Sequence, residues 1–429
     1  MAIVACSTPP GTGGIAVVRL SGKNSFEIAS SLIKKDTKKE KPFTPYLTDL
    51  VDKDGSIFDN AIITQYVAPN SYTGENMVEF SCHGNPIIVS KIIDLCVNYG
   101  SRIAEPGEFT RKAFLNGKLD LAEAEAVSSI IYSKSLVGVK AGLSNLKGLL
   151  SKNIFSIKKS LISVVANLEF NLDISEEDLQ PNIVENTVLL LEDQLKNLKT
   201  IAESYNQSDF FQSGASVVIA GPPNAGKSTL FNKILNKEHS IVTSEKGTTR
   251  DVLEKNIYID GLPIVLKDTA GIRGGKSTAE KIGVSKSKNE ILDADLVIMF
   301  NKKPKINTPE NHIFVFNKSD IKKTGEKYDI KISAKNGKNV GVLKKMIYKK
   351  IVGKLSLGET MLTSKRQSLS VDSCIDSLNS AVLLLKSKES LEIVVEDINS
   401  SIKYLDQITE KTTKDDVLSV VFSSFCVGK

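Results

Sequence analysis

The chain has 429 residues, of which 41% are hydrophobic and 25% charged, and a formal net charge of +6 at pH 7. This composition excludes a disordered chain and indicates a soluble globular protein of two or three domains. Five scattered cysteines and three histidines argue against a disulfide framework and a multi-histidine metal centre. The apolar runs are too short to span a bilayer, and the N-terminus lacks the features of a secretory signal. We therefore expect a cytoplasmic protein with no membrane association.

Short apolar runs between turn signals characterise the first 115 residues. Residues 15–18, 61–63 and 77–80 have the pattern of strands, and residues 87–96 have that of a helix. This part of the chain is expected to form an α/β or α+β domain.

Helical periodicity replaces this pattern from residue 119 to about 205 and returns after about 355. The segment between these regions alternates apolar strand runs with helices, at 216–220, 264–266, 296–300 and 313–316, which is typical of a parallel doubly wound sheet. We therefore expect an α/β domain inserted into one helical bundle that is built from both flanks.

A phosphate-binding loop is predicted at residues 221–228, whose sequence GPPNAGKS fits the P-loop pattern between a strand and a helix. Its backbone N–H groups and the helix N-terminus suit phosphate. Lys227 is expected to neutralise the β- and γ-phosphates, and the Ser228 hydroxyl to bind Mg²⁺.

Three further elements follow in the order that a GTPase needs. Thr249 in the segment 247–251 is the expected switch residue and Mg²⁺ ligand, and the D-x-x-G element begins at Asp268. Asn317, Lys318 and Asp320 form an N-K-x-D element, in which the carboxylate accepts the N1–H and N2–H₂ donors of guanine. The predicted ligand is therefore GTP and not ATP. The full set of predicted GTP-binding residues is Asn224, Ala225, Gly226, Lys227, Ser228, Thr229, Thr243, Ser244, Glu245, Lys246, Gly247, Thr248, Thr249, Asp268, Thr269, Ala270, Gly271, Asn317, Lys318, Asp320, Ser333, Ala334 and Lys335.

Hydrolysis must differ from that of Ras-like GTPases, because the place of their water-orienting glutamine holds Ile272. Glu280 is the candidate for that role, although a surface carboxylate on a helix fits the residues equally well. The candidates for neutralising the negative charge that develops on the phosphates are Arg250, Arg273, or a monovalent cation with Asn224 as one ligand.

The assembled motifs closely resemble the MnmE (TrmE) family of tRNA-modification GTPases. The resemblance extends over the whole chain, at residues 7–15 (STPPGTGGI), 19–22 (RLSG), 70–75 (NSYTGE), 83–84 (HG), 106–110 (PGEFT), 113–126 (AFLNGKLDLAEAEA) and 422–429 (FSSFCVGK). The helical region before the G domain and the loop at 300–313 look short beside other members.

This resemblance implies a cytoplasmic homodimer joined through an N-terminal domain that binds a one-carbon tetrahydrofolate, either the 5,10-methylene or the 5-formyl form. It implies a partner, the FAD-carrying flavoprotein MnmG (GidA), in a heterotetramer or larger assembly. The two proteins add an aminomethyl or carboxymethylaminomethyl group to C5 of the wobble uridine of certain tRNAs.

The resemblance also assigns residues. Arg19, Glu79, Lys118 and Lys429 match the folate-contacting positions; we expect the three cations to meet the carboxylates of the glutamate tail and Glu79 to accept from the pterin ring. Glu280 matches the catalytic glutamate. The expected K⁺ ligands are Asn224, Thr243, Glu245 and Thr248, and the expected Mg²⁺ ligands are Ser228 and Thr249. Cys426 fits either a buried helix-end thiol or a reactive one.

The expected fold is a multidomain one: an N-terminal α+β tetrahydrofolate-binding and dimerisation domain at 1–116, a helical domain at 117–212 and 354–429, and an inserted P-loop (Ras-like) α/β G domain at 213–353. The alternative function is an RNA- or ribosome-associated assembly GTPase of the Era type. A third is a free-standing folate-dependent one-carbon transferase with a regulatory G domain.

Overall fold

The computed structural model describes residues 1–33, 41–172, 182–222, 224–235, 253–268, 291–300, 311–322, 324–352, 361–387, 389–409, 415–423 and 425–429. These residues separate into two compact units. The first unit comprises Met1–Ser128, Asn145–Gln194 and Leu369–Lys429, and the second comprises Ser129–Ser144 and Leu195–Ser368. The four domain ranges expected from the sequence stay a prediction, since these units divide the chain differently.

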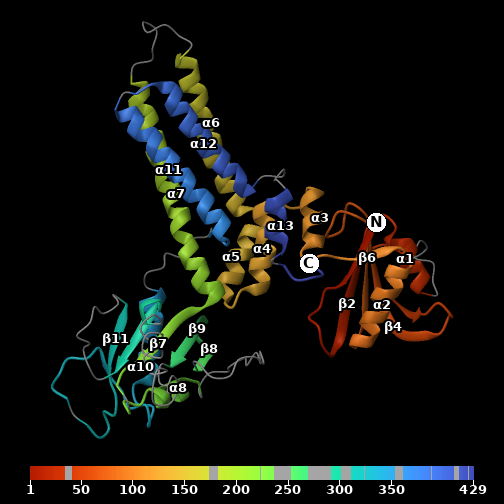
Figure 1. Cartoon of the computed structure of the whole chain (residues 1–429), viewed down its shortest axis with the longest axis horizontal. Coiled ribbons are helices and arrows are strands. Elements are labelled where there is room, and N and C mark those ends of the chain that lie inside the picture. Colours follow the sequence, from red (N-terminus) through yellow and green to blue (C-terminus); the bar gives the residue numbers. More distant parts are fainter. Residues whose placement is uncertain are drawn as a thin grey trace, which may run out of the picture. The chain divides into compact units, whose positions relative to one another are not determined.

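The first unit begins with a six-stranded sheet, drawn in red to orange in Figure 1. Its strand order is β3-β4-β5-β2-β1-β6. Strands β1 and β6 are parallel, and the other neighbours are antiparallel. The strands are β1 (Ala2–Cys6), β2 (Gly13–Ser21), β3 (Tyr46–Val51), β4 (Ile57–Tyr66), β5 (Met77–Gly84) and β6 (Ser101–Ile103). Helices α1 (Ser25–Leu32) and α2 (Pro86–Asn98) pack against one face, and the predicted α+β domain is confirmed.

Side chains alternate across this sheet, as expected for a sheet with one face in the core. Val18 and Leu20 of β2 and Val78 and Phe80 of β5 are fully buried beneath the helices. Arg19, between the first pair, therefore lies on the other face, where it is paired in register with Glu79.

The other face is partly covered by α3 (Glu108–Leu115), whose Phe109 packs with Ile3, Ala5 and Ala104. The opposite side of α3 contacts the C-terminal helix α13 (Asp415–Ser423) through Phe114 and Phe422. The N-terminal sheet and the end of the chain thus meet on α3.

Long helices from both sides of the inserted segment make the helical part of the first unit. Helix α6 (Leu149–Leu172) lies beside α12 (Leu391–Thr409), as Figure 1 shows, and Lys158 pairs with Asp406 across them. The predicted bundle of both flanks is thereby confirmed. Helices α4 (Leu121–Tyr132), α7 (Ile183–Ser213) and α11 (Lys365–Lys386) run across the division between the two units, and most of α5 (Leu136–Leu146) belongs to the second unit. Within the described residues, α11 alone is long and apolar enough to cross a membrane, a test that core helices of soluble proteins also pass.

The second unit contains a six-stranded sheet in the order β12-β11-β10-β7-β9-β8. All neighbours are parallel except the β8–β9 hairpin, so the predicted P-loop α/β fold is confirmed. Strands β7 and β10 are continuous apolar runs because both faces of the sheet are covered. The elements are β7 (Ala215–Ala220), α8 (Lys227–Leu235), β8 (Leu253–Ile259), β9 (Leu262–Asp268), β10 (Leu296–Phe300), β11 (His312–Phe316), β12 (Ile330–Lys331) and α10 (Val340–Val352).

Candidate functional site

Within the described residues of the second unit, the predicted nucleotide-binding loops follow the carboxyl ends of parallel strands. The loop at 221–226 follows the central strand β7, the N-K-x-D element follows β11, and the loop at 333–335 follows β12. Strand β9 ends at Asp268. In open α/β sheets this edge is where ligands bind, so the topology gathers motifs that are distant in the sequence.

The phosphate-binding loop is built on backbone conformations that suit close approach. Gly221 and Gly226 have φ values of +151° and +94°, and Asn224 lies in the left-handed region at +60°. A Cβ on Gly226 would collide with the side-chain nitrogen of Asn317, so only glycine fits there. The loop leads directly into α8, whose first turn holds Lys227, Ser228 and Thr229.

Lys227 is 8% exposed, and its ammonium group donates to the carbonyls of Gly221 at 2.8 Å and Pro222 at 3.1 Å. These bonds fold the side chain back over the loop. The lysine charge is therefore held at the concave side of the loop, where a phosphate chain would approach the helix N-terminus.

Asn317 connects the phosphate loop to the base-side loop. Its Nδ2 donates to the carbonyl of Ala225 at 2.9 Å, and its Oδ1 accepts from the N–H of Ala334 at 3.0 Å. Asn317 is 3% exposed and Ser333 is fully buried. Since buried polar groups need partners, this one carboxamide fixes the spacing of the two loops.

Asp320 and Lys318 lie on the exposed side of the same element. Asp320 is exposed and accepts a long bond, 3.4 Å, from the Nδ2 of Asn336, so its carboxylate is accessible to a base. The Nζ of Lys318 donates to the carbonyl of Asn224 at 3.0 Å. Lys335 is also exposed. The arrangement can present a carboxylate acceptor to the donors of guanine.

Several predicted residues lie outside the described part of the chain, and their roles stay predictions. They are Thr243, Ser244, Glu245, Lys246, Gly247, Thr248, Thr249, Arg250, Thr269, Ala270, Gly271, Ile272, Arg273 and Glu280.

A second polar cluster lies on the free face of the N-terminal sheet. Arg19 Nη2 and Nε donate to Oε1 of Glu79 at 2.7 and 2.9 Å, and the hydroxyl of Tyr66 donates to Oε2 at 3.1 Å. The Arg19 guanidinium carbon lies 5.3 Å from the ring centre of Tyr72 and 5.7 Å from that of Phe109, within the range of cation–π attraction. Two aromatic rings and a carboxylate thus hold one mostly buried guanidinium.

The C-terminal segment contacts this cluster. Ser7 Oγ donates to the carbonyl of Gly428 at 2.9 Å, and the N–H of Phe109 donates to that of Lys429 at 3.2 Å. Burial lowers the pKa of Lys429, and the Arg19 charge lowers it further, while Glu79 opposes both effects. The backbone of Lys429 therefore contacts the cluster at Phe109, and its ammonium group lies within electrostatic range of Arg19 and Glu79. Cys426, two residues from a buried Gly428, is exposed.

The side chain of Lys118 contacts a loop of the N-terminal domain. Its Nζ donates to the carbonyl of Pro69 at 3.1 Å, in the connection between β4 and β5. The sequence interpretation put Arg19 and Glu79 at opposite ends of a folate, but their ion pair places both groups at one point. The two groups are therefore adjacent and form a single polar site on the sheet. Tyr72 and Phe109 lie within the family motifs, but their place beside Arg19 depends on tertiary packing and has no signal in the sequence.

Comparison with known proteins covers the whole chain. Residues 2–118 match the family described as "GTP-binding protein TrmE N-terminus", and residues 121–426 match "MnmE helical domain". The proteins named "tRNA modification GTPase MnmE" from Aquifex aeolicus and Acetivibrio thermocellus are 37% and 36% identical to it, over 100% of this chain and 99% of each relative.

Among solved structures, the G domain of the T. maritima FeoB iron transporter is 25% identical over 32% of this chain and 98% of its own, with a TM-score of 0.24. Era in complex with MgGDPNP and a 16S ribosomal RNA segment is 26% identical over 38% of this chain and 66% of its own, with a TM-score of 0.25. At these TM-scores the two likenesses add nothing to the fold described above.

Proposed function

The chain belongs to the MnmE family of tRNA modification GTPases, and we propose that it is a K⁺-activated GTPase that modifies wobble uridine together with a flavoprotein partner. In this proposal the pair adds an aminomethyl or carboxymethylaminomethyl group to C5 of U34 in certain tRNAs, and a one-carbon tetrahydrofolate supplies the carbon. The observation that carries the proposal is the match over the full length of curated relatives, since a G domain alone would match only the middle of the chain.

The nucleotide loops support GTP as the substrate. The exposed carboxylate of Asp320 is available to the paired donors of guanine, and adenine has no such pair. Asn317 holds the loop at 333–335 at a fixed distance from the phosphate loop. The selectivity for guanine over adenine then follows from the Asp320 carboxylate, which lies on the loops that Asn317 links.

The residues of the phosphate loop fit the proposed metal ions. Ser228 is the second residue of α8, directly after Lys227. Its hydroxyl suits Mg²⁺, because this cation prefers oxygen ligands. Asn224 has a left-handed backbone and offers a side-chain oxygen for K⁺. When bound, the two ions supply positive charge to the phosphates. We propose that Glu280 orients the attacking water, since Ile272 cannot hydrogen-bond one.

The cluster around Arg19 supports a folate site on the N-terminal domain. A pterin presents N–H donors next to a carbonyl acceptor, and the Glu79 carboxylate beside the Arg19 guanidinium is complementary to that pattern. The Lys429 ammonium adds charge for the anionic part of a ligand. We therefore assign Glu79 and Arg19 together to the pterin end, and Lys118 to the carboxylates of the tail.

Homodimerisation through the N-terminal domain is part of the proposal. On the sheet face that carries Arg19 and Glu79, Ile15 is 70% exposed, Leu47 is 61% and Ile62 is 45%. Apolar side chains clustered on a surface are typical of protein contacts. We propose that this face meets a second copy, that the dimer joins the FAD-carrying partner MnmG in a heterotetramer or larger assembly, and that the complex acts on tRNA in the cytoplasm.

The nucleoside content of tRNA tests this function. Deletion of the gene should remove the modified wobble nucleoside, as seen by mass spectrometry, and the wild-type gene should restore it. An Era-type assembly GTPase would instead leave the tRNA nucleosides unchanged and impair ribosomal subunits. A free-standing one-carbon transferase would modify tRNA without the flavoprotein.

A further inference from the structure

The connection between β4 and β5, residues 67–76, contacts the N-terminal cluster at two places. The ring of Tyr72 lies 5.3 Å from the Arg19 guanidinium carbon, and the carbonyl of Pro69 accepts from Lys118 Nζ at 3.1 Å. Two of the four proposed folate residues therefore depend on the position of this one loop.

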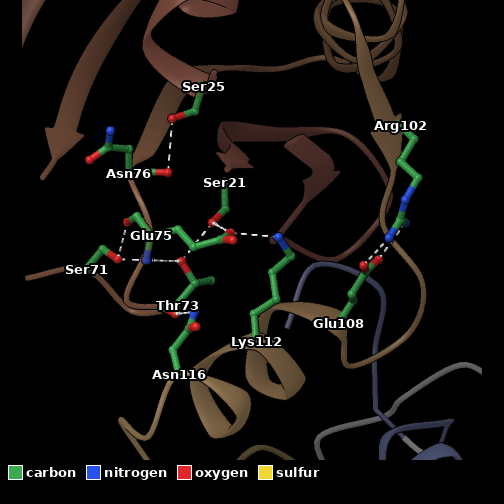
Figure 2. Close-up of polar contacts among 10 residues, drawn as sticks. All are labelled: Ser21, Ser25, Ser71, Thr73, Glu75, Asn76, Arg102, Glu108, Lys112 and Asn116. Carbon is green, nitrogen blue, oxygen red and sulfur yellow. Dashed lines mark hydrogen bonds and ion pairs between the residues drawn. The ribbon is translucent and has the colours of Figure 1, made fainter. Parts of the chain in front are cut away.

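A buried polar network holds the loop against β2 and α3. Thr73 is fully buried, and its hydroxyl lies 2.7 Å from that of Ser21. Figure 2 shows the Glu75 carboxylate between two elements: its Oε2 accepts from Lys112 Nζ at 2.6 Å and from Ser21 Oγ at 3.3 Å. One carboxylate thus joins the loop, the strand and the helix.

The backbone of the loop is held as well. Asn116 Nδ2 donates to the carbonyl of Thr73 at 2.7 Å, and Ser71 Oγ donates to that of Glu75 at 2.5 Å (Figure 2). Gly74 has φ +78°, and a Cβ there would lie 3.1 Å from that of Asn116. The close approach of the loop to the end of α3 needs glycine at this position.

Helix α3 serves both the network and the cluster. It provides Lys112 to Glu75 and, one turn earlier, Phe109 to the Arg19 guanidinium. The hydroxyl of its Thr110 lies 2.8 Å from that of Tyr72. A shift of the loop relative to α3 would therefore move the Tyr72 ring away from Arg19.

Stability alone does not explain the ion pair. Lys112 and Glu75 are 19% and 32% exposed, so the pair is partly open to water, and ion pairs of this kind add little net stability. The pair does join two elements, because the carboxylate of the loop accepts a hydrogen bond directly from the ammonium group of α3. This is what a loop that positions ligand-binding groups needs.

We propose that Glu75 and Lys112 are positioning residues of the N-terminal ligand site, which fix the loop at 67–76 so that Tyr72 and Pro69 hold Arg19 and Lys118 in binding geometry. The identity of the ligand rests on the folate function proposed above. Neither residue contacts the ligand in this account, and both act through the loop.

Calorimetric titration of the full chain with 5-formyltetrahydrofolate tests the inference. Glu75→Gln and Lys112→Met should each weaken binding about tenfold, because each removes the charge attraction that joins the loop to α3. Lys112→Arg keeps the charge and should stay within about threefold of the wild type. The control is Asp52→Asn, which removes another ion pair of the same domain, with Lys91, and should leave the affinity unchanged.

Hydrogen exchange of the same variants separates positioning from direct contact. The amides of 69–76 should exchange faster in Glu75→Gln and Lys112→Met without ligand, while those of β2 and β5 keep the wild-type rates. Weaker binding with unchanged exchange, or faster exchange with wild-type affinity, would overturn the inference. A wild-type chain that does not bind the folate would overturn the proposed ligand instead.

Discussion

The side-chain nitrogen of Asn317 donates to the carbonyl of Ala225 at 2.9 Å, which ties the element after β11 to the phosphate loop after β7. The oxygen of the same carboxamide accepts from Ala334. One buried side chain therefore sets the spacing between the places where phosphate and base are expected to bind.

Substitution of Asn317 by Ala should weaken GTP binding by about tenfold to a hundredfold, because it leaves a buried carbonyl and a buried N–H without this partner. Titration with a fluorescent GTP analogue measures the dissociation constant. Asn336→Ala is the matched control, since among the described residues its amide makes a long, exposed bond to Asp320 and no buried link between the loops. Equal affinities for both variants would contradict the linking role.

Asp320 should determine the base. Asp320→Asn loses the carboxylate acceptor for guanine and gains a donor that suits the C2 carbonyl of xanthine, so GTP binding should fall about tenfold or more while XTP binding improves. Competition between the two nucleotides gives the ratio. Retention of the wild-type preference for GTP would remove Asp320 from the base site.

GTP turnover should be faster in K⁺ than in Na⁺ at equal ionic strength. Glu280→Ala should lower turnover by roughly a hundredfold or more while GTP binding is kept, since a residue that positions water acts on the chemical step. Steady-state phosphate release with a parallel binding titration separates the two effects. Equal rates in both salts would disprove the cation assignment.

As pH rises, the affinity for folate should begin to fall at a lower pH than it would with a lysine of ordinary pKa. Burial and Arg19 lower the pKa of Lys429 from 10.5, so the ammonium loses its charge at a lower pH, and its attraction for an anionic ligand is lost as pH rises through that pKa. Binding titrations across pH measure this. Lys429→Arg, which stays charged, should hold its affinity to higher pH, and identical profiles would contradict the role of Lys429.

The sequence predicted best where local pattern alone determines the structure. The strand at 216–220, the glycine-rich loop and the following helix appear together because a buried parallel strand is a continuous apolar run. The strand expected at 77–80 is likewise confirmed, as part of β5. Strand β8 was missed because its pattern LEKNIYI, on an edge strand, mixes charged and apolar residues.

Contacts between residues that are far apart in the sequence could not be predicted from sequence patterns. The Arg19–Glu79 ion pair depends on the register of β2 with β5, which is set by the whole sheet. The Ser7–Gly428 bond spans 421 positions, so no local signal predicts that the end of the chain meets its beginning. The family resemblance named these positions, but only the structure pairs Arg19 with Glu79 and places the backbone of Lys429 against Phe109 of the same cluster.

Reconstitution tests the central claim most directly. Purified chain, the flavoprotein partner, unmodified tRNA, GTP and a ¹³C-labelled methylenetetrahydrofolate would be combined in K⁺ buffer, and U34 analysed by mass spectrometry. The account predicts a labelled C5 substituent on U34 that is absent when GTP is omitted or when Glu280→Ala replaces the wild type. An unchanged U34 in the complete mixture, while GTP is hydrolysed, would contradict it.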